Sequence, residues 1–298
     1  MVGATAGRAG NGMLRIGCVK YLNARPLTHG WEGDVDFDHP STLCSKLSAG
    51  KLDVALVSSF EFLRNPIYRI VDDVSISSDG PVYSVVVAHR GEIADIEEIE
   101  LDPASETSAN LLRCLLPELG LNPRFVERRT GILSASRTDS SCGEPVGPAG
   151  VSPAVSKSVR RSKLLIGDQA IRFRQEYADE FSFWDLGEQW MKLFNVPFVY
   201  ALWLIRPEVA DLKQIADRLR ALRDENLANL DDLIAEAVAG VADPGLRRGL
   251  DREFLLRYYS DHLRFGFSER EKEGLRTFAM LCATHNLIPN RDLAFSIV

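Results

Sequence analysis

Residues 15–27 read Arg15-Ile16-Gly17-Cys18-Val19-Lys20-Tyr21-Leu22-Asn23-Ala24-Arg25-Pro26-Leu27. The first half alternates small and β-branched apolar residues, which predicts a short buried strand that Pro26 prevents from continuing through a sheet. In an open α/β sheet, ligands bind at the carboxyl ends of the strands. We therefore expect Tyr21, Asn23 and Arg25 to bring an aromatic ring, an amide and a cation to one ligand site. The alternative is a first strand with an ordinary polar exit loop.

Other predicted strands also carry polar residues at or near an end. A strand over 52–57 is followed by Ser58, and Ser84 lies inside a β-branched run over 82–88. A third buried run, residues 164–166, leads into Gly167 and Asp168. We expect these side chains to face the same ligand site as Asn23.

A helix is predicted from Ser105 to Leu119, because its leucines recur on one helical face. Ser105 can cap this helix, and Thr107 and Ser108 add hydroxyl groups to the free N–H groups of its first turn. Such a helix start is a ready anion-binding site. The alternative is a capped core helix without a ligand.

The order of these segments predicts a two-lobed α/β protein with a ligand cleft between the lobes. The apolar runs 82–88 and 198–205 are the expected crossings between lobes, and four helical patterns follow residue 207. The first lobe is predicted to comprise 14–88 and 198–298, and the second lobe 89–197. Residues 1–13 are expected to form a flexible leader, and residues 133–162 a low-complexity loop that carries no chemistry.

Composition excludes several classes of function. The chain of 298 residues has a formal charge of −7, and no basic stripe is available to neutralise the phosphates of a nucleic acid. No apolar run approaches the ~18 residues of a membrane span, and the leader lacks the apolar core of a signal peptide. The five scattered cysteines include no Cys-x-x-Cys pair and are typical of reduced thiols. We therefore expect a cytoplasmic protein without nucleic-acid or membrane partners.

Metal, serine-hydrolase and nucleotide chemistry lack their sequence signatures. The five histidines show no i, i+4 pairing of the kind that metals use, so no metal ligands are predicted. No nucleophile elbow, phosphate-binding loop or dinucleotide fingerprint is present.

The sequence resembles the chorismate dehydratase family, which opens the futalosine route to menaquinone. The resemblance covers nearly everything from Leu14 onward. Four segments carry it: Val19-x-Tyr21-Leu22-Asn23-Ala24-x-Pro26-Leu27, Ser105-x-Thr107-Ser108, Leu164-Leu165-Ile166-Gly167-Asp168 and Pro197-Phe198-Val199-Tyr200-Ala201-x-Trp203. The leader and the loop over 133–162 depart from the family pattern, outside these segments.

The resemblance implies a periplasmic-binding-protein type II fold and the dehydration of chorismate, a small dianion, to 3-[(1-carboxyvinyl)oxy]benzoate without a metal or redox cofactor. On this hypothesis Asn23 and Ser84 are the catalytic donors at the reacting ring. The expected substrate-binding residues are Tyr21, Arg25, Ser58, Thr107, Ser108 and Asp168.

Within that set, Thr107 and Ser108 would hold one carboxylate of the substrate. Asp168 is either a base or a cap and hinge anchor, and the substrate's own side-chain carboxylate is a second candidate for the base. Two other functions stay open: 1,4-dihydroxy-6-naphthoate synthase of the same pathway, and a non-catalytic solute-binding protein.

Overall fold

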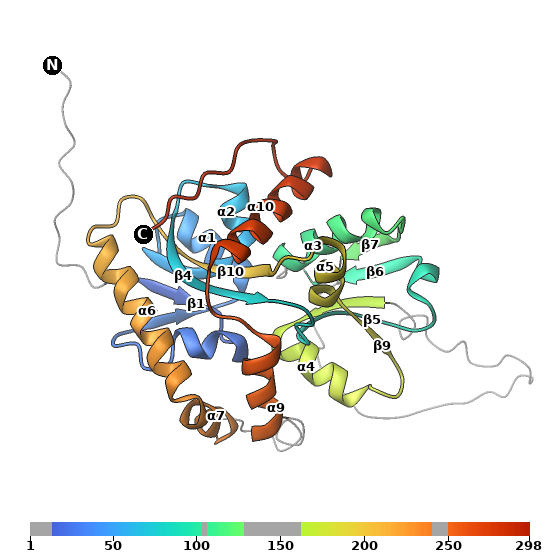
Figure 1. Cartoon of the computed structure of the whole chain (residues 1–298), viewed down its shortest axis with the longest axis horizontal. Helices are drawn as coiled ribbons and strands as arrows, with labels where there is room; N and C mark the ends of the chain where they lie inside the picture. The colour runs from blue at the N-terminus through green and yellow to red at the C-terminus, as the bar shows by residue number, and fades with distance from the viewer. Residues whose placement is uncertain (1–13, 103–105, 128–161, 240–249) are drawn as a thin grey trace, which may run out of the picture.

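The computed structural model describes residues 14–102, 106–127, 162–239 and 250–298 (Figure 1). The expected leader, the predicted cap Ser105 and all but the last residue of the predicted loop over 133–162 lie outside these ranges. That last residue, Ser162, begins a strand. No helix within the described ranges is both long enough and apolar enough to cross a membrane.

The first of two sheets has five strands in the order β2-β1-β3-β10-β4. Strands β2, β1 and β3 are parallel, and β10 lies between β3 and β4, antiparallel to both. The bounds are β1 Ile16–Cys18, β2 Val35–Phe37, β3 Val54–Ser58, β4 Arg69–Ser78 and β10 Phe198–Ile205.

The second sheet also has five strands, in the order β7-β6-β8-β5-β9. Strands β7, β6 and β8 are parallel, and β5 is antiparallel to β8 and β9. The bounds are β5 Val85–His89, β6 Glu98–Leu101, β7 Arg124–Glu127, β8 Ser162–Ile166 and β9 Ser182–Asp185.

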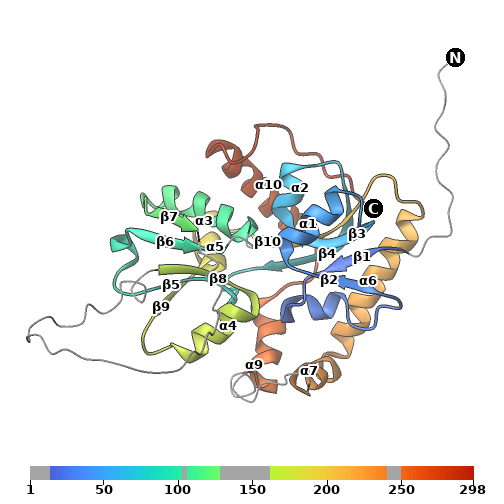
Figure 2. The ribbon, with the colours of Figure 1, turned by 180° about the vertical axis from the view of Figure 1, so that it is seen from behind.

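Helices cover both sheets (Figures 1 and 2). In both views α1, α2 and α10 lie on one side of the first sheet and α6 on the other. The first lobe holds η1 Leu22–Leu27, α1 Pro40–Ser48, α2 Ser59–Arg64, α6 Leu212–Ala228, α7 Leu230–Ala239, α9 Arg252–Arg257, the π-helical turn η4 Tyr258–His262 and α10 Glu269–Thr284. The second lobe holds η2 Ile93–Asp95, α3 Glu106–Glu118, α4 Gly167–Glu176 and α5 Leu186–Phe194.

Within the described residues, the chain crosses between the lobes twice, in the short connections 79–84 and 195–197. Strand β5 pairs only within the second sheet and β10 only within the first, so the crossings lie next to these strands. Two α/β lobes joined by two crossings confirm the predicted fold class. The predicted residue bounds of the lobes stay a prediction.

The hydrophobic core continues across the crossings. The ring of Trp190 in α5 lies 5.0 Å from that of Phe198 in β10, which lies 5.0 Å from Phe278 in α10. All three side chains are almost completely buried. Aromatic burial of this kind, with tilted and edge contacts, stabilises the pair of lobes as well as each lobe.

Local differences from the predicted elements have simple causes. The pattern of residues 41–50 predicts a helix capped by Ser41. Helix α1 instead begins at Pro40, after His39, because proline's fixed φ suits the first helical position. The charged pattern of residues 93–102 predicts an edge-like segment, but its strand β6 lies between β7 and β8. Ser84 precedes β5 instead of lying inside it. The spacing of Ser268 and Glu271 predicts a capping box, which the start of α10 confirms.

Candidate active site

A cavity lies between the two lobes, and its volume is about 650 Å³ when the solvent space at its open entrance is included. Polar side chains reach it from the end of β3, from η1, from the connection before β5 and from the start of α3. Six of the predicted site residues line it: Tyr21, Asn23, Ser58, Ser84, Thr107 and Ser108. The rest of the lining is mostly apolar, so a few fixed polar groups would determine how a ligand is oriented there.

Asn23 offers an unused hydrogen-bond acceptor to this cavity. Its side-chain oxygen Oδ1 is buried and has no hydrogen-bond partner in the described part of the chain. The preceding residue is fixed on both sides: the N–H of Leu22 donates to Asp168 Oδ1 at 3.0 Å, and its carbonyl accepts the hydroxyl of Tyr259 at 2.9 Å. A buried acceptor costs free energy when it lacks a donor, so Asn23 is suited to a ligand that brings one.

Ser84 is fully buried, and three hydrogen bonds hold it. Its N–H donates to the carbonyl of Val82 at 2.7 Å, and its carbonyl accepts the N–H of Gly167 at 2.8 Å. Its hydroxyl oxygen accepts the phenolic hydroxyl of Tyr258 at 2.7 Å. Because a serine hydroxyl carries one proton and two lone pairs, this arrangement leaves the Ser84 proton free to be donated into the cavity.

The start of α3 meets the end of β3 across the cavity. The Thr107 hydroxyl is hydrogen-bonded to the Ser58 hydroxyl and accepts the N–H of Phe60 at 3.3 Å. Both Thr107 and Ser108 lie in the first turn of a 13-residue helix, where free N–H groups and the helix dipole favour an anion. The predicted anion-binding residues therefore line the cavity, and Thr107 also connects the two lobes.

Two predicted site residues lie outside this cavity. Arg25 lines a neighbouring pocket, and its guanidinium lies 3.9 Å from the carboxylate of Glu236. Residues 22–27 form a 3₁₀ helix, in which positions 23 and 25 point in different directions, whereas a strand would have placed them on one face. Asp168 lines the same neighbouring pocket as Arg25. Burial raises the pKa of the Asp168 carboxyl to about 6.

Sequence and structure comparisons place the chain among known proteins. The sequence model of a family described as menaquinone biosynthesis matches residues 14–143 and 144–284. The chorismate dehydratase of Thermus thermophilus is 30% identical over 285 residues, which cover 89% of this chain and 93% of that protein. The chain belongs to the menaquinone biosynthesis family.

Solved structures confirm the fold that was predicted for this family member. A protein of Archaeoglobus fulgidus aligns with a TM-score of 0.65 at 21% identity, over 92% of this chain and 98% of the other. The periplasmic aliphatic sulphonate binding protein of Escherichia coli aligns with a TM-score of 0.58 at 13% identity, over 93% and 94% of the two chains. These similarities show the periplasmic-binding-protein fold.

Three tyrosines around the cavity were not predicted as site residues from the sequence. Tyr200 lines the cavity and shares a 3.1 Å hydrogen bond with the Ser78 hydroxyl. Tyr258 and Tyr259 contact Ser84 and Leu22 from the π-helical turn η4. The hydrophobic pattern places all three tyrosines in the core, and nothing in that pattern marks their hydroxyl groups.

Asp185 was also missed, although its sequence position carried a signal. It directly precedes α5 and accepts the N–H groups of Gly187 and Glu188 at 3.1 and 3.2 Å, as an N-cap does. It also accepts the N–H groups of Val82 and Tyr83, at 3.1 and 2.8 Å. Asp185 thus fixes the crossing that carries Ser84.

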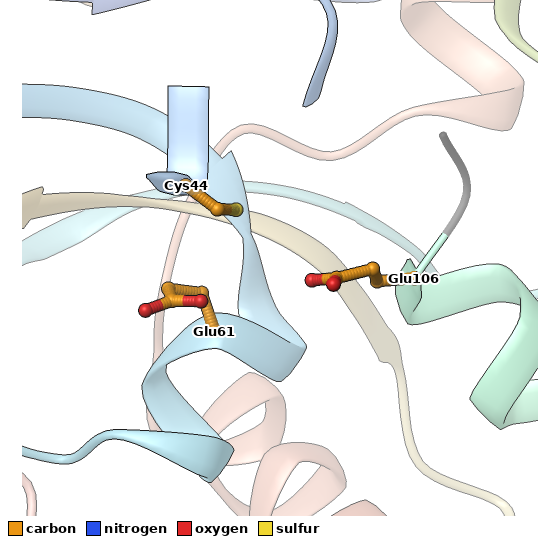
Figure 3. A group of neighbouring side chains, drawn as sticks. All are labelled: Cys44, Glu61 and Glu106. Carbon is orange, nitrogen blue, oxygen red and sulfur yellow. The ribbon is translucent and has the colours of Figure 1, made fainter. Parts of the chain in front are cut away.

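Cys44, Glu61 and Glu106 form a further cluster of possible ligand groups beside the cavity (Figure 3). Arg64 already pairs with the carboxylates of both Glu61 and Glu106, the second at 3.0 Å. Burial raises the pKa of the Cys44 thiol to about 12, so this thiol keeps its proton at neutral pH. Arg64 thus joins Glu61 in α2 to Glu106 in α3 in an ion-pair network, and Cys44 of α1 lies beside it.

Proposed function

We propose that this protein is a chorismate dehydratase of menaquinone biosynthesis, which eliminates water from chorismate to give 3-[(1-carboxyvinyl)oxy]benzoate. Membership of the menaquinone biosynthesis family and the 30% identity to a chorismate dehydratase support this assignment. The structural observation that supports this assignment is the cavity between the lobes, which is lined by both Asn23, with its unpartnered amide oxygen, and Ser84, with its hydroxyl. These are neutral groups, suited to hold and polarise a small polar ligand.

The reaction removes a proton from C3 of the ring and hydroxide from C4, and a C3–C4 double bond forms. The ring becomes aromatic, which supplies the driving force. Ser84 donates a hydrogen bond to the departing hydroxyl, because Tyr258 already occupies one lone pair of its oxygen. Asn23 accepts or donates a hydrogen bond at the same part of the ring. Donors fixed in advance stabilise the charge that develops on the leaving oxygen.

The proton from C3 passes to the carboxylate of the substrate's own enolpyruvyl side chain in this proposal. No histidine belongs to the residues that line the described cavity. The proton then combines with the leaving hydroxide, directly or through the Ser84 hydroxyl, so that one molecule of water is released. Asp168 serves as an anchor, because its carboxylate accepts the Leu22 N–H and faces a neighbouring pocket.

The second carboxylate of the dianion binds at the start of α3. Free backbone N–H groups of the first helical turn and the hydroxyls of Thr107 and Ser108 supply donors there. Ser58 approaches from the opposite lobe. A carboxylate bound here would therefore contact both lobes and favour the closed cleft.

The protein also acts in the cytoplasm on this proposal. The four cysteines in the described residues are buried free thiols. The sulfur atoms of Cys114 and Cys282 lie 3.8 Å apart as hydrogen-bonded free thiols, which fits a reducing compartment.

The test is to incubate the purified protein with chorismate and to follow products by liquid chromatography and mass spectrometry. We expect 3-[(1-carboxyvinyl)oxy]benzoate to form with loss of one water, and the Ser84→Ala variant to form it at least about 100-fold more slowly. Binding of chorismate without turnover would instead support a solute-binding protein. If the protein neither binds nor converts chorismate, the result would favour 1,4-dihydroxy-6-naphthoate synthase.

A further inference from the structure

Two adjacent tyrosines contact the two segments that carry the proposed catalytic donors. Tyr258 donates its hydroxyl to Ser84 Oγ at 2.7 Å, and Tyr259 donates to the carbonyl of Leu22 at 2.9 Å. Both side chains are buried, with 0% and 3% of their surface exposed. One short element therefore contacts Ser84 directly and the residue next to Asn23.

This element, η4, has π-helical geometry over Tyr258–His262. Such turns are rare and are frequently found at functional sites. A third member, His262, hydrogen-bonds through Nδ1 to the carbonyl of Pro81 at 2.9 Å, in the same crossing that carries Ser84. The turn thus contacts the crossing at two points and η1 at one.

Ring packing fixes the direction of the two hydroxyls. The Tyr258 ring stacks on Phe254 at 5.8 Å, and its centroid lies 5.7 Å from that of Tyr259. Burial raises the pKa of each phenol well above its usual value, so both hydroxyls keep their protons. Each tyrosine is therefore a permanent donor at a fixed position.

We infer that Tyr258 and Tyr259 are positioning residues: Tyr258 makes Ser84 a one-directional donor into the cavity, and Tyr259 fixes the backbone that holds Asn23. This inference rests on the proposed dehydratase function. Without the Tyr258 hydroxyl, Ser84 loses the donor that occupies one lone pair, and its own proton can turn away from the substrate. Without the Tyr259 hydroxyl, the Leu22 carbonyl loses its partner and the Asn23 amide is less firmly held.

The first experiment compares the kinetics of Tyr258→Phe and Tyr259→Phe with those of wild type. Each variant removes one oxygen atom and keeps the ring. We expect kcat to fall about 10-fold or more, the factor that one net hydrogen bond supplies, while KM changes little. The matched control is Tyr68→Phe, which loses a buried hydroxyl bonded to Glu61 at 3.3 Å, outside the cavity lining. Its kcat should remain at the wild-type value.

A double-mutant cycle separates positioning from a loss of general stability. In a Ser84→Ala background, Tyr258→Phe should cause no further fall in kcat, because the group through which Tyr258 acts is gone. Tyr259→Phe should likewise cause no further fall in an Asn23→Ala background. Effects that multiply in both cycles, or wild-type kcat in both single variants, would overturn the inference.

Crystal structures of the two phenylalanine variants keep the test independent of the reaction. If wild type does not convert chorismate, the proposed function is wrong, but the positions of Ser84 and of Leu22–Asn23 still decide the inference. We expect Ser84 to change rotamer in Tyr258→Phe and the 22–23 backbone to shift in Tyr259→Phe. Unchanged positions in both structures would show that the tyrosines do not position these groups.

Discussion

The carboxylate of Asp168, in the second lobe, accepts the backbone N–H of Leu22, in the first lobe, at 3.0 Å. This hydrogen bond spans the two lobes one residue before Asn23. On its other side, Leu22 is held by Tyr259. The position of the Asn23 amide therefore depends on how the two lobes meet.

The pH dependence of activity is expected to follow Asp168. Burial raises the pKa of its carboxyl to about 6, so below that pH the group is neutral and a weaker acceptor for the Leu22 N–H. We expect kcat/KM of wild type to fall as pH drops through about 6. Asp168→Asn keeps an acceptor oxygen but does not titrate, and its profile should lack this fall. Parallel profiles for the two proteins would contradict the prediction.

The same carboxyl affects stability with a definite sign. Its folded pKa of about 6 lies above the value of 3.8 for a free aspartate carboxyl, so the folded state binds more protons between these values. The free energy of unfolding should therefore decrease as pH rises from about 4 to 6. In Asp168→Asn this contribution to the pH dependence of the free energy of unfolding should be absent. Urea unfolding at several pH values measures both proteins.

Removing either candidate hydrogen-bonding side chain should lower turnover with the fold intact. In Ser84→Ala and Asn23→Ala we expect kcat for chorismate to fall at least about 100-fold, since losing one fixed donor in a dry site costs roughly 3–4 kcal/mol. Circular dichroism and thermal unfolding serve as the check on folding. Near-wild-type turnover in both variants would remove these residues from the mechanism.

The sequence pattern located much of the cavity because strand ends and helix starts are local features. Asn23, Ser58 and Thr107 each follow a break in hydrophobic periodicity, and all three line the cavity. Parallel strands bring the ends of β1 and β3 to one edge of the first sheet, which groups Asn23 with Ser58. Thr107 follows β6 of the second sheet and reaches the same cavity from the other lobe. Their chemical roles stay predictions.

The remaining parts of the site depend on tertiary geometry that no local pattern contains. Arg25 points elsewhere because 22–27 wind into a 3₁₀ helix. Asp168 lies beyond a left-handed residue, Gly167 with φ of 55°, which starts α4 directly at the strand end. Tyr258 and Tyr259 lie in a π-helical turn inside a region whose periodicity indicates an ordinary α-helix. Their partners are more than 170 residues away in sequence.

Asp185 should be a major source of stability at the crossing between lobes. Its buried carboxylate accepts N–H groups from Val82, Tyr83, Gly187 and Glu188. In Asp185→Ala these donors lose their acceptor, and we expect the free energy of unfolding to fall by at least about 2 kcal/mol. Ser268→Ala, which removes an ordinary helix cap from α10, is the comparison and should cost less. An equal or smaller loss in Asp185→Ala would refute this role.

Gly167 should control the position of the Tyr21 ring. A Cβ atom at Gly167 would lie 3.2 Å from this ring, which lines the cavity and the neighbouring pocket of Arg25 and Asp168. In Gly167→Ala we therefore expect Tyr21 to be displaced and KM for chorismate to rise several-fold. Gly120→Ala is the matched control, because Gly120 has φ of 69° but nothing within 4 Å of the added Cβ. Both variants should lose about 1 kcal/mol of stability from the left-handed backbone, and only Gly167→Ala should change KM. An unchanged KM in Gly167→Ala would mean that the Tyr21 ring adapts without loss of substrate affinity.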